Sequence, residues 1–282
     1  MAEKDFLQDP LTSRQNPTVK KICSLLDKKT RKKEKMFRFD GKKLFFEAVA
    51  KGLDIRFVVL NENIDDSLKS QISFFVESGK LDRRVIFAVS EQVFLKMSEE
   101  NAPEGIITVA SFLEDKHRKI EAADSYSIDG KARILIGESL RDPGNLGTVI
   151  RSAAALGIDK LILTDDCADL YSPKTVRAAM GGLFSLKIDT VCTGELALLV
   201  TRLRSSGRRI YATALRTDAK DIGSLELRSG DAFIIGNEGH GLSEAVIEAS
   251  DGAVIIPMVE GNESLNAAAA ATICIWETVR SR

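Results

Sequence analysis

The sequence has few of the residues that build metal and disulfide sites. Its 282 residues include 4 cysteines and 2 histidines, and the cysteines are scattered. Without closely spaced pairs of ligands we expect reduced thiols and no structural metal. Long hydrophobic runs are also lacking: none approaches the ~18 residues of a membrane span, and the N-terminal residues lack the apolar stretch of a signal peptide. We therefore expect a cytoplasmic protein that uses neither a metal nor a membrane.

Net charge is nearly absent as well, at −1, so the whole molecule does not favour a polyanionic partner. The charge is uneven, however, because residues 1–43 carry 13 lysines and arginines against 6 aspartates and glutamates. The densest part is Lys28–Lys35, which includes Lys32 and Lys33. Such a segment is either a solvated helix face or an arm that contacts nucleic-acid phosphates.

Length and composition allow two α/β domains, with 44% hydrophobic and 29% charged residues. We expect a flexible polar tail over residues 1–16. Alternating short helices and strands over residues 17–110 predict a compact α/β module. The charged, aperiodic segment 111–131 ends in a turn and is expected to be a linker. A second domain is expected over residues 132–282.

The second domain has the pattern of a parallel sheet. Strands are predicted near residues 132–136, 160–163, 183–188, 209–212, 232–235 and 253–256, and helices over 145–156, 173–180, 195–205, 243–249 and 264–280. Short strands that are apolar on both faces and alternate with helices indicate parallel pairing. Ligands bind such sheets beyond the carboxyl ends of the strands, so the loops after Ile136, Ala212, Ile235 and Ile256 are the candidate site.

The first of these loops leads into residues 140–157, LRDPGNLGTVIRSAAALG. The turn-forming sequence Asp142-Pro143-Gly144 precedes Asn145, which we expect to cap a helix that begins at Leu146. Gly147 lies one helical turn before Arg151, so the arginine side chain would lie beside bare backbone. The segment is either a binding site or an ordinary connection with a surface arginine. It lacks the GxGxxG spacing of a dinucleotide site, which disfavours a nucleotide-binding oxidoreductase.

Two further loops have an unusual composition. After the strand at 232–235, Glu238 stands among three glycines, which permit close backbone approach to a ligand. Residues 256–266, IPMVEGNESLN, lead into a run of five alanines. The alanine run either lets another helix pack closely or only reflects high helix propensity.

Together these three segments resemble the signature motifs of the SpoU (TrmH) family of RNA ribose 2′-O-methyltransferases, in the SPOUT superfamily. The matching residues are Asn145, Gly147 and Arg151 in the first motif, Gly236, Glu238 and Gly239 in the second, and Ile256, Pro257, Met258, Ser264, Leu265 and Asn266 in the third. The motifs occur in order and at the family's spacing. Residues 17–110 resemble the family's N-terminal substrate-binding domain, which is similar to small RNA-binding ribosomal proteins.

The resemblance implies a SPOUT-type α/β fold, with a deep trefoil knot in the C-terminal parallel sheet and a smaller N-terminal α/β RNA-binding domain. Members bind S-adenosylmethionine within the knot and work as homodimers through the C-terminal domain, with the last helix in the interface. Carried over by position, Leu215, Gly236, Ile256 and Leu265 would hold the cofactor. Apolar side chains suit adenine and a thioether, and loop amides supply polar contacts.

The resemblance also implies that Arg151 acts on the ribose hydroxyl. A guanidinium has a pKa above ~12, which argues against simple base catalysis. Either a substrate phosphate holds Arg151 while it polarises or deprotonates the hydroxyl, which we favour, or Arg151 only stabilises the developing alkoxide. Asn145 and Asn266 would orient Arg151 and the ribose, and Glu238 would position a cationic group or Ser264.

The expected reaction is methyl transfer to a ribose 2′-hydroxyl of RNA. The two-domain layout resembles members that act on 23S ribosomal RNA; transfer RNA is the alternative substrate, and a non-catalytic RNA-binding protein is the alternative class. RNA contacts are expected at Lys32, Lys33, Arg141, Lys174 and Arg177. The sequence departs from the family at Ala179, where serine is usual, so any contact that a serine hydroxyl makes there is missing. His240 is expected to be a loop residue and not a base.

Overall fold

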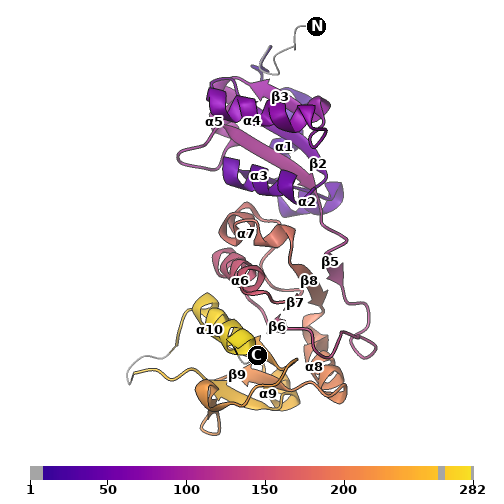
Figure 1. Cartoon of the computed structure of the whole chain (residues 1–282), viewed down its shortest axis with the longest axis vertical. Coiled ribbons are helices and arrows are strands. Elements are labelled where there is room, and N and C mark those ends of the chain that lie inside the picture. The colour runs from indigo at the N-terminus through magenta and orange to yellow at the C-terminus, as the bar shows by residue number, and fades with distance from the viewer. Residues whose placement is uncertain (1–8, 260–263, 281–282) are drawn as a thin grey trace. The chain divides into compact units, whose positions relative to one another are not determined.

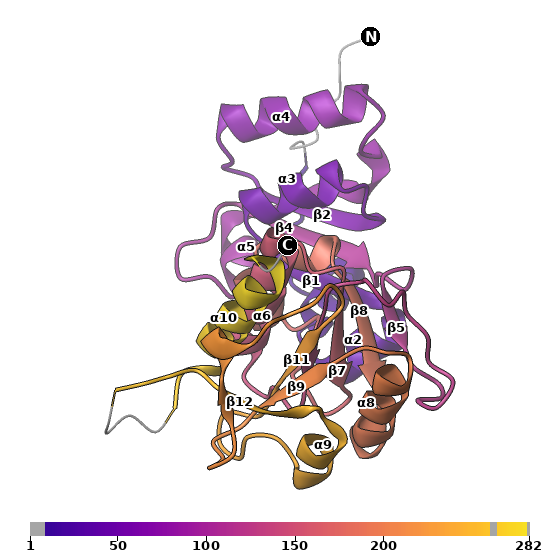
Figure 2. The same cartoon turned by 60° about the horizontal axis from the view of Figure 1, so that its bottom comes forward.

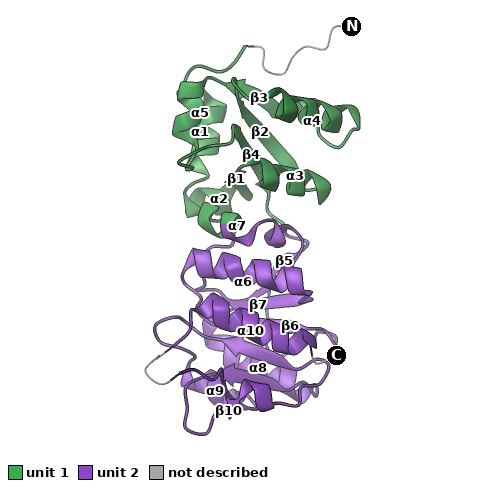
Figure 3. Ribbon diagram, turned by 60° about the vertical axis from the view of Figure 1, so that its left-hand side comes forward, with its two compact units in different colours: residues 1–113, 171–177 green, residues 114–170, 178–282 purple. Residues whose placement is uncertain are grey.

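The computed structural model describes residues 9–259 and 264–280, and the chain divides into two compact units, which Figure 3 colours separately. The first unit comprises residues 1–113 with 171–177, and the second comprises residues 114–170 with 178–282. All four cysteines are free thiols. Within the described ranges, no helix has both the length and the apolar character needed to cross a bilayer.

The first unit is a four-stranded sheet with helices on both faces (Figure 1). Its strands are β1 (Met36–Asp40), β2 (Ile55–Asn61), β3 (Ile86–Val89) and β4 (Ile106–Ser111), in the order β1-β4-β2-β3. Strand β4 is antiparallel to β1 and β2, whereas β2 and β3 are parallel. Its helices are α1 (Pro17–Ser24), α2 (Lys28–Glu34), α3 (Lys42–Ala50), α4 (Asp66–Glu77) and α5 (Glu91–Met97). Alternate strand residues face α1 and α5 on one side and α3 and α4 on the other, as the two-residue period of a strand requires.

Two features of this unit differ from the sequence-based expectation. The sequence predicts no strand over β1, where the charged Arg38 interrupts the apolar pattern. Arg38 is nevertheless buried, because its Nη2 donates to Asp40 Oδ1 at 2.8 Å. Leu11, within the expected flexible tail, instead lies beside β3: its N–H donates to the Ala88 carbonyl and its carbonyl accepts from the Ser90 N–H.

The second unit contains an eight-stranded, entirely parallel sheet in the order β10-β12-β9-β11-β6-β7-β8-β5. In chain order its strands are β5 (His117–Lys119), β6 (Ile134–Gly137), β7 (Lys160–Thr164), β8 (Lys187–Val191), β9 (Ile210–Thr213), β10 (Lys220–Asp221), β11 (Ala232–Ile235) and β12 (Gly252–Ile255). Helices α8 (Leu196–Ser205) and α9 (Glu244–Ala249) pack on one face. Helices α6 (Pro143–Leu156) and α10 (Ala267–Arg280) lie side by side on the other (Figures 1 and 2). Helix α7 (Pro173–Ala179) lies between β7 and β8 in the chain.

The predicted parallel sheet and smaller N-terminal α/β domain are confirmed, with shifted boundaries. The strand predicted at 183–188 starts only at Lys187, because residues 182–184 form a 3-10 turn. The expected linker 111–131 contains β5, an edge strand that pairs with β8. The last helix starts at Ala267 and not at Ser264, because the Asn266 side chain caps it.

Candidate active site

The helix that carries the first motif starts earlier than predicted. Its cap is Asp142 and not Asn145, since Asp142 Oδ1 accepts a hydrogen bond from the Asn145 N–H at 2.8 Å. Pro143 occupies the first helical position, which tolerates a residue without an N–H. Asn145 therefore lies within the first turn of α6, where its side chain is available for contacts outside the helix.

Three of the predicted catalytic residues form a hydrogen-bonded chain. Asn145 Nδ2 donates to Glu238 Oε1 at 2.9 Å, and Asn145 Oδ1 accepts from Asn266 Nδ2 at 2.9 Å. The far end of the chain is anchored, because Asn266 Oδ1 accepts from the backbone N–H groups of Ala268 and Ala269 at the start of α10. The fold thus joins one residue from each of the three motifs.

Sheet register explains why these motifs meet. Ile235 at the end of β11 pairs with Gly137 at the end of β6, so the loops that follow the two strands start side by side. In the hydrogen-bonded chain, Asn145 is 93 positions from Glu238 and 121 positions from Asn266 in the sequence. Parallel pairing brings the carboxyl ends of β6 and β11 to one edge of the sheet, and Asn266 reaches the same edge from the start of α10.

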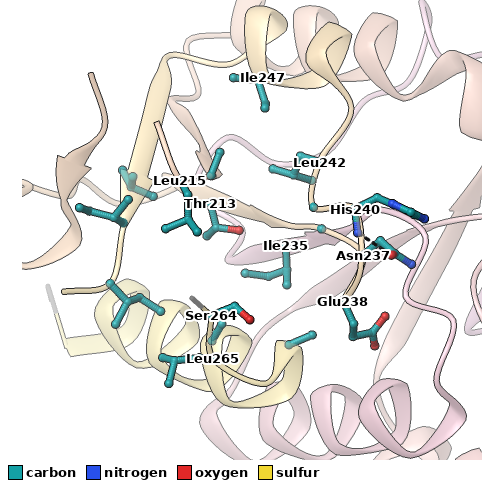
Figure 4. A pocket seen from close by; sticks show the side chains of 18 of the residues that line it. Thr213, Leu215, Ile235, Asn237, Glu238, His240, Leu242, Ile247, Ser264 and Leu265 are labelled. Atoms are coloured by element: carbon teal, nitrogen blue, oxygen red, sulfur yellow. Dashed lines mark hydrogen bonds between the residues drawn. The ribbon is translucent and has the colours of Figure 1, made fainter. Parts of the chain in front are cut away.

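A cavity of about 550 Å³ lies beside this chain, as Figure 4 shows. Its lining includes all the residues predicted to hold the cofactor, namely Leu215, Gly236, Ile256 and Leu265, and two of the predicted catalytic residues, Glu238 and Ser264. The inner wall is apolar and includes the buried Ile235 and Leu242, whereas Leu215 is 69% exposed. The size falls in the range of pockets that enclose a small organic ligand.

Backbone, not side chains, forms the wall at Gly236. A Cβ atom there would lie 2.5 Å from the Gly241 carbonyl carbon, so no larger residue fits. The close approach arises because Asn237 and Gly241 exchange two backbone hydrogen bonds of 3.0 Å, which fold residues 236–241 into a tight loop. Exposed peptide groups of such a loop can come within hydrogen-bonding distance of a ligand.

Arg151 lies away from the hydrogen-bonded chain. It is exposed and stands six residues beyond Asn145, about 9 Å along the axis of α6. No described residue forms an ion pair or hydrogen bond with its guanidinium. The backbone beside it is firmly packed, since a Cβ on Gly182 would lie 3.2 Å from the Arg151 Cα. The guanidinium is therefore placed on a rigid helix and open to a substrate.

The predicted RNA contacts are exposed side chains, and two of them form ion pairs within the protein. Lys32 and Lys33 are exposed on α2. Arg141 Nη2 lies 3.1 Å from Asp166 Oδ2, and Arg177 Nε lies 2.7 Å from Glu100 Oε1. Lys174 is exposed on α7.

One residue of the basic segment has a structural role that its sequence does not reveal. Arg31 is buried, and its Nη1 donates to the carbonyls of Leu25 and Leu26 at 2.8 and 2.7 Å. The basic segment is thus not uniformly a solvated face.

The sequence analysis did not predict a polar cluster that holds residues 236–243, the glycine-rich loop. Asn237 Nδ2 donates to the Ser139 carbonyl at 2.8 Å, and Asn237 Oδ1 accepts from the backbone N–H groups of Gly239 and His240. His240 itself is an exposed loop residue that lines the cavity. The only available signal was a polar pair, Glu138-Ser139, directly after a buried strand.

Asp166 ties this cluster to the end of β7. Burial raises the pKa of Asp166, but hydrogen bonds from Ser139, Thr164, Arg141 and Thr193 outweigh that effect and hold the pKa at about 2. The carboxylate is therefore ionised throughout the neutral range. Across the described ranges, no three His, Cys, Asp or Glu side chains are grouped so as to hold a metal ion.

Comparison with known proteins places the chain in a family. Residues 132–276 match the SpoU rRNA Methylase family, and residues 16–108 match the MRM3-like substrate binding domain. The chain therefore belongs to the SpoU rRNA methylase family, as its motifs predict.

Several relatives match most of the chain. The 23S rRNA (guanosine(2553)-2′-O)-methyltransferase RlmP of Bacillus subtilis is 31% identical over 268 residues, which cover 94% of this chain and 97% of that protein. A 23S rRNA (uridine(2479)-2′-O)-methyltransferase of Streptomyces viridochromogenes is 33% identical over 198 residues, 69% of this chain and 67% of that protein. The AdoMet-bound rRNA methyltransferase of Sinorhizobium meliloti superposes with a TM-score of 0.80 at 26% identity, covering 96% of this chain and 97% of that one.

Proposed function

We propose that the protein transfers a methyl group from S-adenosylmethionine to a ribose 2′-hydroxyl of 23S ribosomal RNA. The observation that carries the proposal is the Asn266–Asn145–Glu238 chain beside a cavity lined by every predicted cofactor residue. Family membership and the reactions named for the two 23S rRNA relatives support the reaction and the substrate class.

The residues of the cavity fit the cofactor. Ile256 and Leu265, with Leu215 from the opposite loop, offer apolar surface to an adenine ring and a thioether, and the loop at Gly236 offers bare backbone to polar groups. S-adenosylmethionine, when bound, supplies an electrophilic methyl group. The protein's own contribution is to hold a ribose hydroxyl in line with that group, and such positioning is a large part of many rate enhancements.

In this proposal Asn145 orients the ribose, because both ends of its amide are held by Glu238 and Asn266 and the amide cannot turn. Arg151 acts on the hydroxyl. A guanidinium keeps its proton at neutral pH, so Arg151 does not take up the hydroxyl proton. A substrate phosphate holds the guanidinium, which polarises the hydroxyl and stabilises the developing alkoxide, and the hydroxyl proton is released to solvent water. Ser264, which lines the cavity, is a further member of the proposed catalytic residues.

The proposal extends to RNA binding. Lys32 and Lys33 on α2, and Lys174 and Arg177 on α7, would contact RNA phosphates from the first unit, and Arg141 would do so from the second. The domain division that goes with it is a substrate-binding domain over residues 17–110, a linker over 111–131 and a catalytic domain over 132–282.

The proposal also includes the knot, the quaternary structure and the location expected from the family resemblance. It includes a deep trefoil knot in the C-terminal domain, a homodimer through that domain, and a cytoplasmic location. Trp276 supports the dimer, because it lies on α10 with 54% of its surface exposed, and large aromatic side chains are enriched at interfaces. Sedimentation of the wild-type protein and of Trp276→Glu would test the interface.

The test is transfer of labelled methyl from S-adenosylmethionine to total RNA from a strain that lacks this gene. Arg151→Ala should bind the cofactor as wild type does and lose methyl transfer, whereas Arg84→Ala, which removes an exposed arginine of the first unit, should keep both. Label in ribosomal RNA supports the proposed substrate, and label only in transfer RNA replaces it. Cofactor binding without label in either fraction would redirect the search to an assembled particle. No binding and no label would favour the non-catalytic reading, and near-normal activity of Arg151→Ala would reject the role of Arg151.

A further inference from the structure

One carboxylate in the second unit is buried without a cationic partner among the described residues. Glu138 follows β6 and is only 5% exposed. Its Oε2 accepts a hydrogen bond from the Ser243 N–H at 2.9 Å, and its Oε1 accepts one from the Ser243 hydroxyl at 2.7 Å. Burying a carboxylate without an opposite charge costs stability, so the group calls for a role beyond packing.

Ser243 marks the point where the glycine-rich loop ends, because it is the residue before α9. The start of the same loop is held by Asn237, whose side chain donates to the Ser139 carbonyl. The two neighbouring residues Glu138 and Ser139 thus hold both ends of residues 236–243.

Ser139 is itself held in an uncommon conformation. Its φ of 55° lies in the left-handed region, which non-glycine residues seldom adopt. Its N–H donates to Thr164 Oγ1 at 2.7 Å and its hydroxyl donates to Asp166 Oδ2 at 2.6 Å. Strained backbone of this kind persists where the surroundings determine it and is frequent at functional sites.

The loop held in this way forms one wall of the cavity. Every residue from Gly236 to Leu242 lines the cavity, and Figure 4 shows Asn237, Glu238, His240 and Leu242 along this wall. The loop also carries Glu238 to Asn145. A shift of the loop would therefore change both the shape of the cavity and the hydrogen-bonded chain.

We propose that Glu138 is a positioning residue, whose carboxylate fixes the end of the loop at Ser243 so that residues 236–242 keep the shape that binds the cofactor. The inference rests on the proposed function, because it takes the cavity to be the S-adenosylmethionine site. Glu138 does not line the cavity and acts only through Ser243. A carboxylate with a purely structural role would instead be replaceable by an apolar side chain of similar size, without effect on the loop.

The test compares Glu138→Leu, Glu138→Gln and Ser243→Ala with the control Ser250→Ala. Ser250 is also buried near α9, where its hydroxyl donates to the Val246 carbonyl, but it does not line the cavity. Leucine fills the space of Glu138, and Ser243 is exposed enough to turn to water, so we expect Glu138→Leu to fold. Glutamine keeps an acceptor for the Ser243 N–H.

Two readouts distinguish positioning from folding. We expect calorimetry to give S-adenosylmethionine binding weaker on the order of tenfold for Glu138→Leu, about threefold or less for Glu138→Gln, and unchanged for Ser250→Ala. We expect hydrogen exchange of the loop amides at 239–243, measured without ligand, to quicken in Glu138→Leu while exchange in β6 and β11 stays as in wild type.

The outcomes separate this inference from the proposed function. If the wild-type protein does not bind S-adenosylmethionine, the proposed function fails, and loop exchange alone decides the role of Glu138. If the wild type binds and Glu138→Leu binds equally well with unchanged exchange, Glu138 is not a positioning residue. Should Glu138→Leu not fold, Glu138→Ala, which removes both acceptors, decides together with Ser243→Ala, which removes the hydroxyl bond alone. Unchanged affinity and exchange in both variants would overturn the inference.

Discussion

Asn266 serves two functions at once, and two substitutions separate them. Its Oδ1 caps α10 through the Ala268 and Ala269 N–H groups, and its Nδ2 donates to Asn145 Oδ1. Asn266→Ala removes both contacts. Asn266→Asp keeps an excellent cap but replaces the donor toward Asn145 with a second acceptor.

The magnitudes follow from these contacts. Loss of the cap in Asn266→Ala costs about 1 kcal/mol, which lowers the melting temperature by about 2–4 °C in a unit of this size. Asn266→Asp should melt near wild type. In that variant, however, two oxygens face each other where Asn145 Oδ1 now lies 2.9 Å from a donor. Rotating the Asn145 amide does not help, because its oxygen would then face the carboxylate of Glu238.

We therefore expect stability and activity to rank the two variants in opposite orders. Asn266→Asp should be the more stable protein and the poorer enzyme, with single-turnover methyl transfer reduced on the order of a hundredfold, against about tenfold for Asn266→Ala. Thermal melting and single-turnover assays on the same preparations check both halves. If Asn266→Asp is as active as Asn266→Ala or more so, the hydrogen-bonded chain does not position the substrate; if it melts as low as Asn266→Ala, the cap is not what Asn266 contributes.

Two further predictions concern charge. Replacing Lys32 and Lys33 with alanine should reduce the slope of log RNA affinity against log salt by about 1 to 2. The control Lys51→Ala should leave the slope unchanged. An unchanged slope in the lysine variant would mean that Lys28–Lys35 is only a solvated helix face. Asp166 has a folded-state pKa of about 2, below the ordinary value of 3.8, so its stabilising effect is complete above pH ~4 and is lost as pH falls through 2. Asp166→Asn should therefore flatten the fall in unfolding free energy between pH 4 and 2, measured by urea titration, and an equally steep fall would refute the assignment.

The architecture of the second unit was predictable because it depends on local pattern. Strands β6 and β11 are buried along their length, and β7 is buried except at Lys160. Such short apolar runs are typical of a parallel sheet that is covered on both faces. Strand β1 was not predictable in this way. It contains the buried Arg38, and burial there depends on a partner that no periodicity reveals.

The site was predictable residue by residue only where a family motif names the residue. The contacts that hold those residues were not, because they span long separations. Glu138 and Ser243 are 105 positions apart, and Asn237 and Ser139 are 98 apart. Even the local start of α6 was misjudged, since aspartate and asparagine are equally good caps and only the structure decides between Asp142 and Asn145.

That choice of cap has a consequence for catalysis. If Asn145 capped α6, its side-chain oxygen would be directed to the N–H groups of its own helix and away from Asn266. With Asp142 as the cap, the amide of Asn145 is available to join Asn266 on one side and Glu238 on the other. Asn266 has no such substitute and performs both tasks. Substitution at Asn266 should therefore change both stability and activity, whereas substitution at Arg151, whose side chain is exposed, should change activity alone.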